Sequence, residues 1–269
     1  MPQATPLSPA EATVLLSPNL LKGQAAVKAT LLFLLATGVL RIEEIEQAGM
    51  FRNKKIAHLR IAAEPKNAPP EIAAVVEVVR AAQADGGRIG DVVERAEKAF
   101  GPACLQFSVK FIIPALIARG LLQKKKLLFT HYFRLTPEGA TAQARIKSDL
   151  FKADDAARLL KSDPAQAAAL AKTLGTNVLL SDKLTKAFKP LADAMRAHGG
   201  ADSLVFTETG PQHGHHSGVF DFGSFDPGSF DLGSFAAGAI DAVHSGMAAF
   251  DASFSDGGGG HDGGSGGHH

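Results

Sequence analysis

The sequence predicts a mostly α-helical protein with small β-hairpins, organised as tandem winged-helix-like units followed by a helical segment and a disordered Gly-rich tail. Three observations favour this architecture. Apolar residues recur at helical spacing through most of residues 1–200. Two pairs of short alternating stretches interrupt the helices, as β-hairpins do. From residue 201 onward the chain is rich in Gly, Ser, Asp and His, a composition that cannot build a core.

The first winged-helix-like unit is expected at residues 1–63. The stretch "LSPAEATVLL" predicts a helix, because Ser8 can cap it, Pro9 suits its first position and Glu11 completes a capping box. "GQAAVKATLLFLLA" predicts a second helix that Gly38 ends. The alternating stretches "VLRIEE" and "KIAHLRIAA" then predict two strands joined by a basic turn. Helix, helix, strand, turn, strand is the order of a winged helix.

The second unit is expected at residues 64–137, entered through a proline-rich linker at Glu64–Glu71. "PEIAAVVEVVRAAQA", "RIGDVVERAEKAF" and "CLQFSVKFIIPALIARG" predict three helices, the last bent at Pro114. "LLQKKKLLFTHYFRL" predicts a hairpin, and Thr136 with Pro137 predicts the start of the next helix. An unrelated helical α+β domain is the alternative interpretation of the same patterns.

The rest of the chain divides into a helical segment at residues 138–200 and a low-complexity tail at residues 201–269. In the segment, Asp163 and Pro164 predict a helix start and Gly175 a helix end. The tail has nine acidic residues and no Lys or Arg, so it carries a charge of −9. Residues 1–200 hold all 28 basic residues and therefore carry +10. A basic body thus bears an acidic tail, a pattern typical of interaction surfaces.

Cysteine content and hydropathy predict a cytoplasmic protein. A single Cys rules out a disulfide framework and fits a reducing compartment. The N-terminus has no basic region followed by an apolar run, so no secretory signal is expected. The longest uncharged apolar stretch, Ala29–Leu40, is too short to cross a bilayer core of about 30 Å. We therefore expect no transmembrane segment, with peripheral attachment to a membrane as a further option.

Several stretches carry a family resemblance. "LSPAEATVLL", "KATLLFLLATGVLRIEE", "ARGLL", "LTPEG" and the tail ending in "GGGGHDGGSGG" resemble the cytoplasmic region of bacterial predicted membrane proteins of unknown function with a glycine-rich C-terminal tail. The resemblance implies winged-helix-like domains and no particular reaction. A weaker similarity, through "KATLLFLLATGVLRI" and "LIARGLLQKKKLL", is to the Golgi phosphoprotein-type lipid-binding fold. That similarity implies binding of an anionic phosphoinositide headgroup.

Basic residues gather at the two predicted hairpins, where wings of winged helices touch phosphates. The candidate anionic-ligand-binding residues are Arg52, Lys54, Lys55, Arg60, Lys124, Lys125, Lys126 and Arg134. The helices that would enter a major groove are too apolar to read bases, with only a few polar side chains such as Gln106, Ser108 and Lys110. The alternative is that these cations merely solvate strand edges and discourage aggregation.

A phenylalanine repeat predicts docking by the tail. In "FDFGSFDPGSFDLGSF" a Phe recurs every five residues, and a further apolar stretch follows it. The candidate docking residues are Phe220, Phe225, Phe230, Phe235 and Phe250. They would act as aromatic contacts on a flexible acidic linker, in grooves of the body or of another copy. A drifting repeat without a partner is the alternative.

Catalytic motifs are not found in the sequence, so neither enzymatic activity nor a cofactor is expected. Histidines in the tail offer weak metal ligands, namely His213, His215, His216, His268 and His269. A soluble spacer is the alternative for those histidines. The sequence therefore favours a non-enzymatic interaction or scaffold protein with a protein partner or self-association. Nucleic-acid binding through the basic wings and anionic-lipid headgroup binding at a membrane surface are the alternatives.

Overall fold

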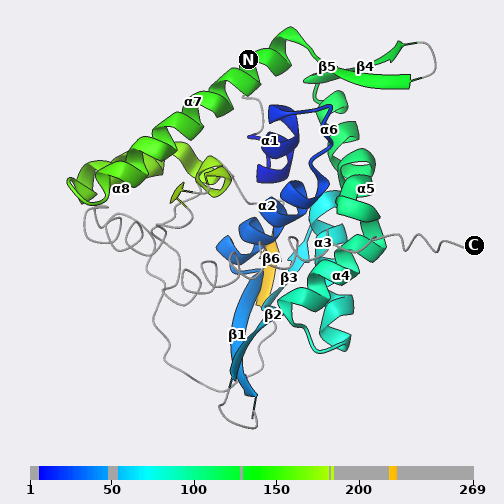
Figure 1. The fold of residues 1–269 in the computed structure, drawn as a ribbon, viewed down its shortest axis with the longest axis vertical. Coiled ribbons are helices and arrows are strands. Elements are labelled where there is room, and N and C mark those ends of the chain that lie inside the picture. Colours follow the sequence, from blue (N-terminus) through cyan, green and yellow to red (C-terminus); the bar gives the residue numbers. More distant parts are fainter. Residues whose placement is uncertain (1–5, 48–53, 128–129, 182, 185–217, 223–269) are drawn as a thin grey trace, which may run out of the picture.

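The computed structural model describes residues 6–47, 54–127, 130–181, 183–184 and 218–222 (Figure 1). The helices are α1 (Pro9–Leu16), α2 (Gly23–Ala36), α3 (Pro70–Ala84), α4 (Ile89–Phe100), α5 (Leu105–Phe107), α6 (Ile113–Ala118), α7 (Pro137–Leu159) and α8 (Pro164–Leu174). The strands are β1 (Leu40–Gln47), β2 (Lys54–Ile61), β3 (Ala63–Lys66), β4 (Leu122–Leu127), β5 (Thr130–Leu135) and β6 (Gly218–Asp221).

The predicted fold class is confirmed at the level of a mostly helical protein with small antiparallel strand pairs. β1 pairs with β2 and β4 pairs with β5, both antiparallel, at the two places where hairpins were expected. The assignment of winged-helix units and the division at residues 63, 137 and 200 stay predictions. An isolated bridge between His58 and Arg88 links the first hairpin to the turn between α3 and α4, so the two predicted units share a backbone contact.

Helices begin where the sequence places capping residues. Ser8 Oγ accepts a hydrogen bond from the backbone N–H of Glu11 at 3.2 Å, and the Glu11 carboxylate accepts one from the Ser8 N–H at 2.8 Å. Thr136 Oγ1 caps α7 and Asp163 Oδ1 caps α8 in the same way, each with a proline at the next position. These side chains satisfy amide groups that have no partner inside the helix.

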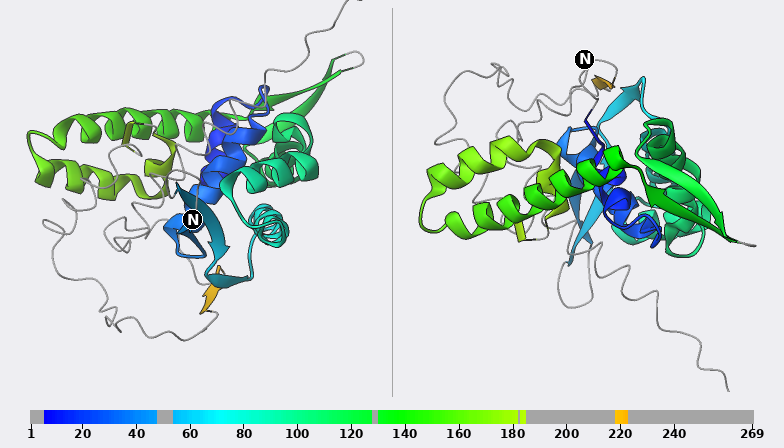
Figure 2. Two further views of the ribbon diagram at one scale, coloured as in Figure 1. Left: turned by 60° about the horizontal axis from the view of Figure 1, so that its bottom comes forward. Right: turned by 90° about the horizontal axis from the view of Figure 1, so that it is seen from above.

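One continuous hydrophobic core joins the helices. α2 lies at its centre, because most of its residues are buried, and Leu31, Leu34 and Leu35 are each at most 1% exposed. α1 packs on one side of α2, and the group formed by α3, α4, α5 and α6 packs on another (Figure 2). α7 reaches this core through Ile146 and is tied to α1 by Gln143, whose Nε2 donates to the carbonyls of Leu15 and Leu16.

The third helix of the second predicted unit was expected to bend at Pro114. Its irregular part instead lies just before this proline. A 3₁₀ turn (Pro102–Cys104), the short α5 and a π-helical segment (Ser108–Ile112) precede α6. Pro114 has no N–H to donate, and its ring would clash with the carbonyl four residues earlier. The π-helical segment accommodates both effects upstream of the proline. Ser108, one of the few polar side chains of this predicted helix, is buried.

The proline-rich stretch at Glu64–Glu71, predicted as a linker, is largely regular structure. Its first residues belong to β3, and its last two form the start of α3. β3 follows β2 after a break, where the N–H groups of Ala62 and Ala63 both donate to the carbonyl of Val39. Its only partner among the described strands is β6, which runs parallel to it and comes from the tail (Figure 1).

Candidate functional site: a captured tail strand and a basic hairpin

The β3–β6 pair brings together two segments that are far apart in the sequence. The Cα register aligns Ala63 with Gly218 and Lys66 with Asp221, so a basic residue is aligned with an acidic one at the end of the pair. The N–H of Phe222, just past the end of β6, donates to the carbonyl of Lys66 at 2.9 Å. This is β-strand addition, in which backbone hydrogen bonds hold an extended peptide against an exposed strand edge.

An aromatic contact fixes the end of the captured strand. The ring of Phe222 lies 6.3 Å from the ring of Phe33 on α2, with the two planes inclined by 45°. Phe33 is 3% exposed, and Phe222 is half-buried against the core. Aromatic pairs at such distances contribute about 0.5–1.5 kcal/mol beyond the area they bury. The side-chain contact therefore adds to the backbone pairing.

β3 is held in place from the helical side. Arg80 on α3 donates two hydrogen bonds from Nη2 to the Glu64 carboxylate, at 2.8 and 3.0 Å, and also pairs with Glu77. These carboxylates, Glu64 first, raise the pKa of Arg80 above its usual range. After β3 the chain turns at Asn67, which has a positive φ of 53°. Asn tolerates this left-handed conformation better than most residues. The strand edge offered to β6 is thus positioned by its neighbours.

One of the five predicted docking residues lies at this site. Phe220 lies in β6, aligned with Pro65. The other four predicted residues lie outside the described residues, at positions 225, 230, 235 and 250. Phe222, the residue that contacts Phe33, was missed because it falls between two members of the five-residue repeat. The strand-like alternation in "GVFDF", with Phe at every second position, was the signal that could have identified it.

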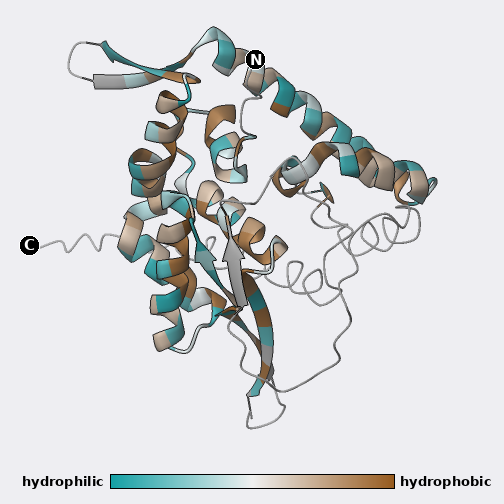
Figure 3. Ribbon diagram, turned by 180° about the vertical axis from the view of Figure 1, so that it is seen from behind, coloured by the Kyte–Doolittle hydropathy of each residue, from teal (hydrophilic) through white to brown (hydrophobic). Residues whose placement is uncertain are grey.

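The β4–β5 hairpin projects from the body next to the start of α7 (Figure 1). Its sequence, "LQKKKLLFTHYFRL", holds four cationic residues and no Asp or Glu. Lys124, Lys125, Lys126 and Arg134 are exposed. Within the part of the chain that the structure describes, no carboxylate pairs with any of the four. Figure 3 shows hydrophilic residues along this projecting hairpin.

The register distributes these charges over both faces of the hairpin. Lys125 is opposite Tyr132, and Gln123 is opposite Arg134, which places Lys125, Tyr132 and Arg134 on one face. Lys124 and Lys126 lie on the other face, because successive side chains alternate along a strand. Tyr132 is 39% exposed, so its ring accompanies the cations at the surface.

The base of the same hairpin is anchored by specific contacts. The N–H of Phe133 donates to Asn19 Oδ1 at 3.0 Å, which ties β5 to the loop after α1. Thr136 Oγ1 donates to the carbonyl of Gly120 at 2.6 Å. At Gly139 the backbone of α7 approaches so closely that a Cβ would lie 1.9 Å from the carbonyl oxygen of Leu121. The motif "LTPEG" therefore serves as the junction between hairpin and helix.

The first hairpin differs from the second in its charge balance. β1 contributes three Glu residues, and Glu43 pairs with Arg41 at 2.6 Å and with Arg60 at 3.6 Å. β2 contains Lys54 and Lys55, whose Cα positions align with Gln47 and Glu46. Arg52 lies outside the described residues. The two predicted basic sets are therefore unequal, because acidic residues of the partner strand balance the first set.

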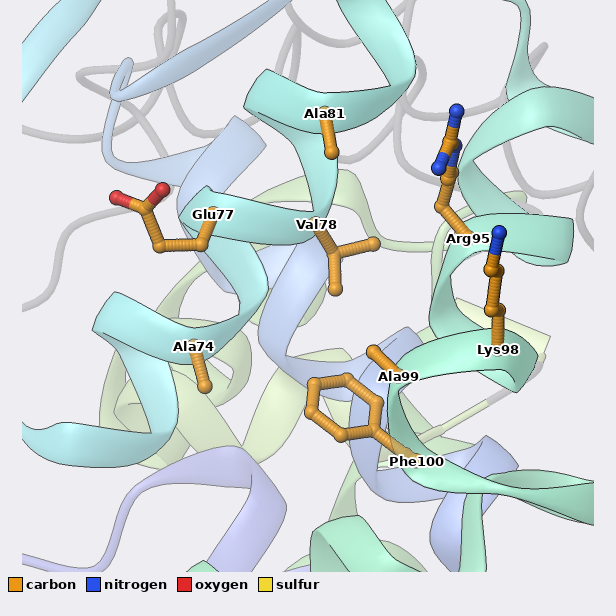
Figure 4. Close-up of a pocket in the computed structure, with 8 residues that line it drawn as sticks. All are labelled: Ala74, Glu77, Val78, Ala81, Arg95, Lys98, Ala99 and Phe100. Atoms are coloured by element: carbon orange, nitrogen blue, oxygen red, sulfur yellow. The ribbon is translucent and has the colours of Figure 1, made fainter.

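The helices themselves offer little to a polar ligand. The shallow depression of about 380 Å³ between α3 and α4 is lined mainly by Ala74, Val78, Ala81, Ala99 and Phe100, with Arg95 and Lys98 at one side (Figure 4). Arg95 is paired with Asp85 at 2.5 Å.

Two ionisable groups inside the body have shifted pKa values. Burial, with a smaller contribution from Glu97, raises the pKa of the Cys104 thiol to about 12. Burial also raises the pKa of Glu71, which is 7% exposed, and the nearby Glu11 carboxylate adds to this effect. Glu11 is itself buried and pairs with Arg119 at 2.8 Å. Glu11 lies on α1 and Glu71 at the start of α3, whereas Cys104 ends the 3₁₀ turn before α5 and its carbonyl lies against Gly23 of α2. None of these residues lines the depression between α3 and α4.

The histidines predicted as weak metal ligands, His213, His215, His216, His268 and His269, lie outside the described residues. Within the described ranges, no group of three or more His, Cys, Asp or Glu residues is arranged to hold a metal ion. No single described helix combines the length and apolarity needed to cross a membrane. The helical pair Ile89–Phe100 and Pro102–Ala118 meets these criteria only when its two parts, bent by 68°, are taken together.

Comparisons of this chain with known protein families, with curated proteins and with solved structures return no match.

Proposed function

We propose that this chain is a non-enzymatic interaction protein whose folded body captures short phenylalanine-containing strands. One observation carries the proposal: Gly218–Phe222 pairs with the edge of β3 and places Phe222 against Phe33. Backbone pairing supplies affinity, and the site beside Phe33 supplies selectivity for an aromatic side chain. The partner is either the protein's own tail or an equivalent segment of another copy.

Charge supports the same proposal. The tail carries −9 and residues 1–200 carry +10, so attraction between them raises the rate at which the tail meets the body. The β3–β6 register also aligns the acidic residue Asp221 with the basic residue Lys66, so the charges at this position attract as well. Electrostatic attraction thus favours encounter, and the strand pairing with its aromatic contact fixes the docked position.

Hydrogen exchange followed by mass spectrometry tests this proposal in the full-length chain. Replacing Phe222 with Ser should speed exchange in the peptide that contains Ala63–Lys66, because β6 protects that edge less well. Phe206→Ser is the matched control, since it removes a tail phenylalanine outside β6, and it should leave exchange unchanged. Equal exchange in the wild-type protein and the Phe222 variant would contradict the proposal.

A second candidate function is binding of a polyanion by the β4–β5 hairpin. It is favoured by four exposed cations for which the described residues supply no carboxylate partner. Among polyanions, nucleic acid fits best, because the cations occupy both faces of a projecting ribbon and Tyr132 lies beside Lys125. A membrane surface would contact one face of such a ribbon, whereas phosphates of a nucleic acid can contact both faces, and bases can stack on an aromatic ring.

Salt titration tests this second function with a short fluorescent DNA duplex and with vesicles containing phosphatidylserine. Lys124, Lys125 and Lys126 are changed together to Glu; the control changes Lys147, Lys161 and Lys172, which are exposed on or beside α7 and α8, in the same way. Affinity for DNA should fall steeply between about 50 and 200 mM salt. Only the hairpin variant should lose binding and reduce the salt slope, by about 2–3.

Three results would decide against nucleic acid as the ligand. Equal loss in the hairpin variant and in the control would show that net charge alone governs binding. Retained DNA binding in the hairpin variant would place the contact elsewhere. Binding to the vesicles with no binding to DNA would assign the hairpin to an anionic lipid surface.

A further inference from the structure

The site on β3 takes one short strand, and the tail repeats the sequence of that strand. Gly218-Val219-Phe220-Asp221-Phe222 aligns with three later five-residue stretches of the tail. They are Gly-Ser-Phe-Asp-Pro at 223–227, Gly-Ser-Phe-Asp-Leu at 228–232 and Gly-Ser-Phe-Ala-Ala at 233–237. The repeats thus differ most at the position that Phe222 occupies in the captured strand.

The two contacts of Phe222 indicate what a residue at this position needs, namely a backbone N–H and a large apolar side chain. Its N–H donates to the carbonyl of Lys66, and its side chain packs on Phe33. Pro227 stands at this position in the second stretch and has no N–H, so the Lys66 carbonyl would lose that partner. Ala237 in the fourth stretch keeps the N–H and offers only a methyl group to Phe33. Leu232 in the third stretch provides both the N–H and a large apolar side chain.

The position before it adds a second requirement. In the β3–β6 register Asp221 aligns with Lys66, and opposite charges on adjacent strands are favourable. Asp231 in the third stretch and Asp226 in the second both preserve this charge. Ala236 in the fourth stretch does not.

We propose that Gly228–Leu232 is a second ligand for the site formed by β3 and Phe33, and that this site selects the pattern Gly-x-Phe-Asp followed by a large apolar residue. This inference rests on the proposed capture of tail strands. The tail therefore holds two strands that fit one site, and between them one strand that proline excludes. Replacement of Gly218–Phe222 by Gly228–Leu232 in the site moves the docked point of the tail by ten residues.

Peptide binding to the full-length chain tests the selectivity directly. The double variant Phe222→Ser with Leu232→Ser empties the site while leaving the body unchanged, which circular dichroism verifies. Three fluorescent peptides are then titrated: Gly-Val-Phe-Asp-Phe, Gly-Ser-Phe-Asp-Leu and Gly-Ser-Phe-Asp-Pro. The first two should bind, and the leucine peptide should bind about tenfold more tightly than the proline peptide, because proline has no N–H for the Lys66 carbonyl and its ring reaches less far than the leucine side chain.

Hydrogen exchange in the tail variants gives a second measurement of the same inference. Exchange in the peptide containing Ala63–Lys66 should be slowest in wild type, intermediate in Phe222→Ser and fastest in the double variant. Leu232→Ser alone should match wild type. Adding Pro227→Leu to the double variant should slow exchange again, because the second stretch then has the required amide and side chain.

The outcomes separate this inference from the function on which it rests. If none of the three peptides binds the double variant, capture of tail strands is itself wrong. If the phenylalanine peptide binds and the leucine and proline peptides bind equally weakly, capture stands and the second ligand is overturned. Equal exchange in Phe222→Ser and in the double variant would overturn the second ligand as well.

Discussion

Phe222 in the tail and Phe33 in the central helix are aromatic neighbours, with ring centroids 6.3 Å apart. Their positions in the sequence are separated by almost the whole folded body, so this contact is a long-range tertiary interaction. It joins a glycine-rich segment of low core-forming capacity to α2, most of whose residues are buried. The contact makes part of the tail a ligand of the body.

Gly139→Ala should destabilise the protein by about 1–3 kcal/mol, as overpacking does, because a Cβ at this position would lie 1.9 Å from the Leu121 carbonyl oxygen. The obstacle is backbone, so α7 or the start of β4 would have to move. Urea unfolding measures the change. Gly90→Ala is the control: nothing lies within 4 Å of its Cβ, and it should stabilise α4 by several tenths of a kcal/mol. Equal effects of the two substitutions would contradict the close approach of α7 to Leu121.

Glu71→Gln should change how stability depends on pH. Burial raises the pKa of Glu71 above 4.5 in the native state, so the native protein binds this proton more tightly than the unfolded chain. The free energy of unfolding therefore falls as pH rises from about 4.5 through the native pKa. Gln cannot ionise, so the variant lacks this fall. The difference in the free energy of unfolding between variant and wild type should therefore grow with pH over that interval, and at neutral pH the variant should be the more stable protein by about 1 kcal/mol. A difference that is constant with pH would contradict a raised native pKa.

Cys104 should be unreactive toward thiol reagents in the native protein. It is fully buried, and burial raises its pKa to about 12, so almost no thiolate forms at neutral pH. The rate of modification by a disulfide reagent should follow the unfolded fraction as urea is added. Rapid modification without urea would show that the region around the Pro102–Cys104 turn opens easily, contrary to its packing against Gly23.

Local features of the fold could be predicted from the sequence because their causes are local. Ser8, Thr136 and Asp163 cap helices through hydrogen bonds to residues three positions away, so short motifs suffice to identify them. The hairpins follow from alternation and from turn length. The register of β4 with β5 places no Asp or Glu of the described strands opposite Lys124, Lys125, Lys126 or Arg134, and this result follows once the strands are paired.

Features that depend on distant partners could not be predicted in this way. β3 lies in a proline-rich stretch, and its partner β6 comes from a distant part of the chain, so the pairing of the two strands could not be predicted from either segment alone. Glu71 was predicted to lie in a linker, yet it is buried, and the charges of Glu11 on α1 and of Arg119 at the end of α6 both act on its carboxyl group. The repeat drew attention to Phe220, whereas the N–H of Phe222 and its contact with Phe33 define the captured strand.

Nuclear Overhauser spectroscopy of full-length protein with isotope-labelled phenylalanine tests the central claim most directly. We predict cross-peaks between the ring protons of Phe33 and Phe222, assigned by the loss of the Phe222 signals in Phe222→Ser. We also predict slow exchange of the Phe222 amide, which donates to the Lys66 carbonyl. Random-coil shifts for the Phe222 ring, with no cross-peak to Phe33 and an amide that exchanges as fast as in a free peptide, would contradict capture of the tail by the body.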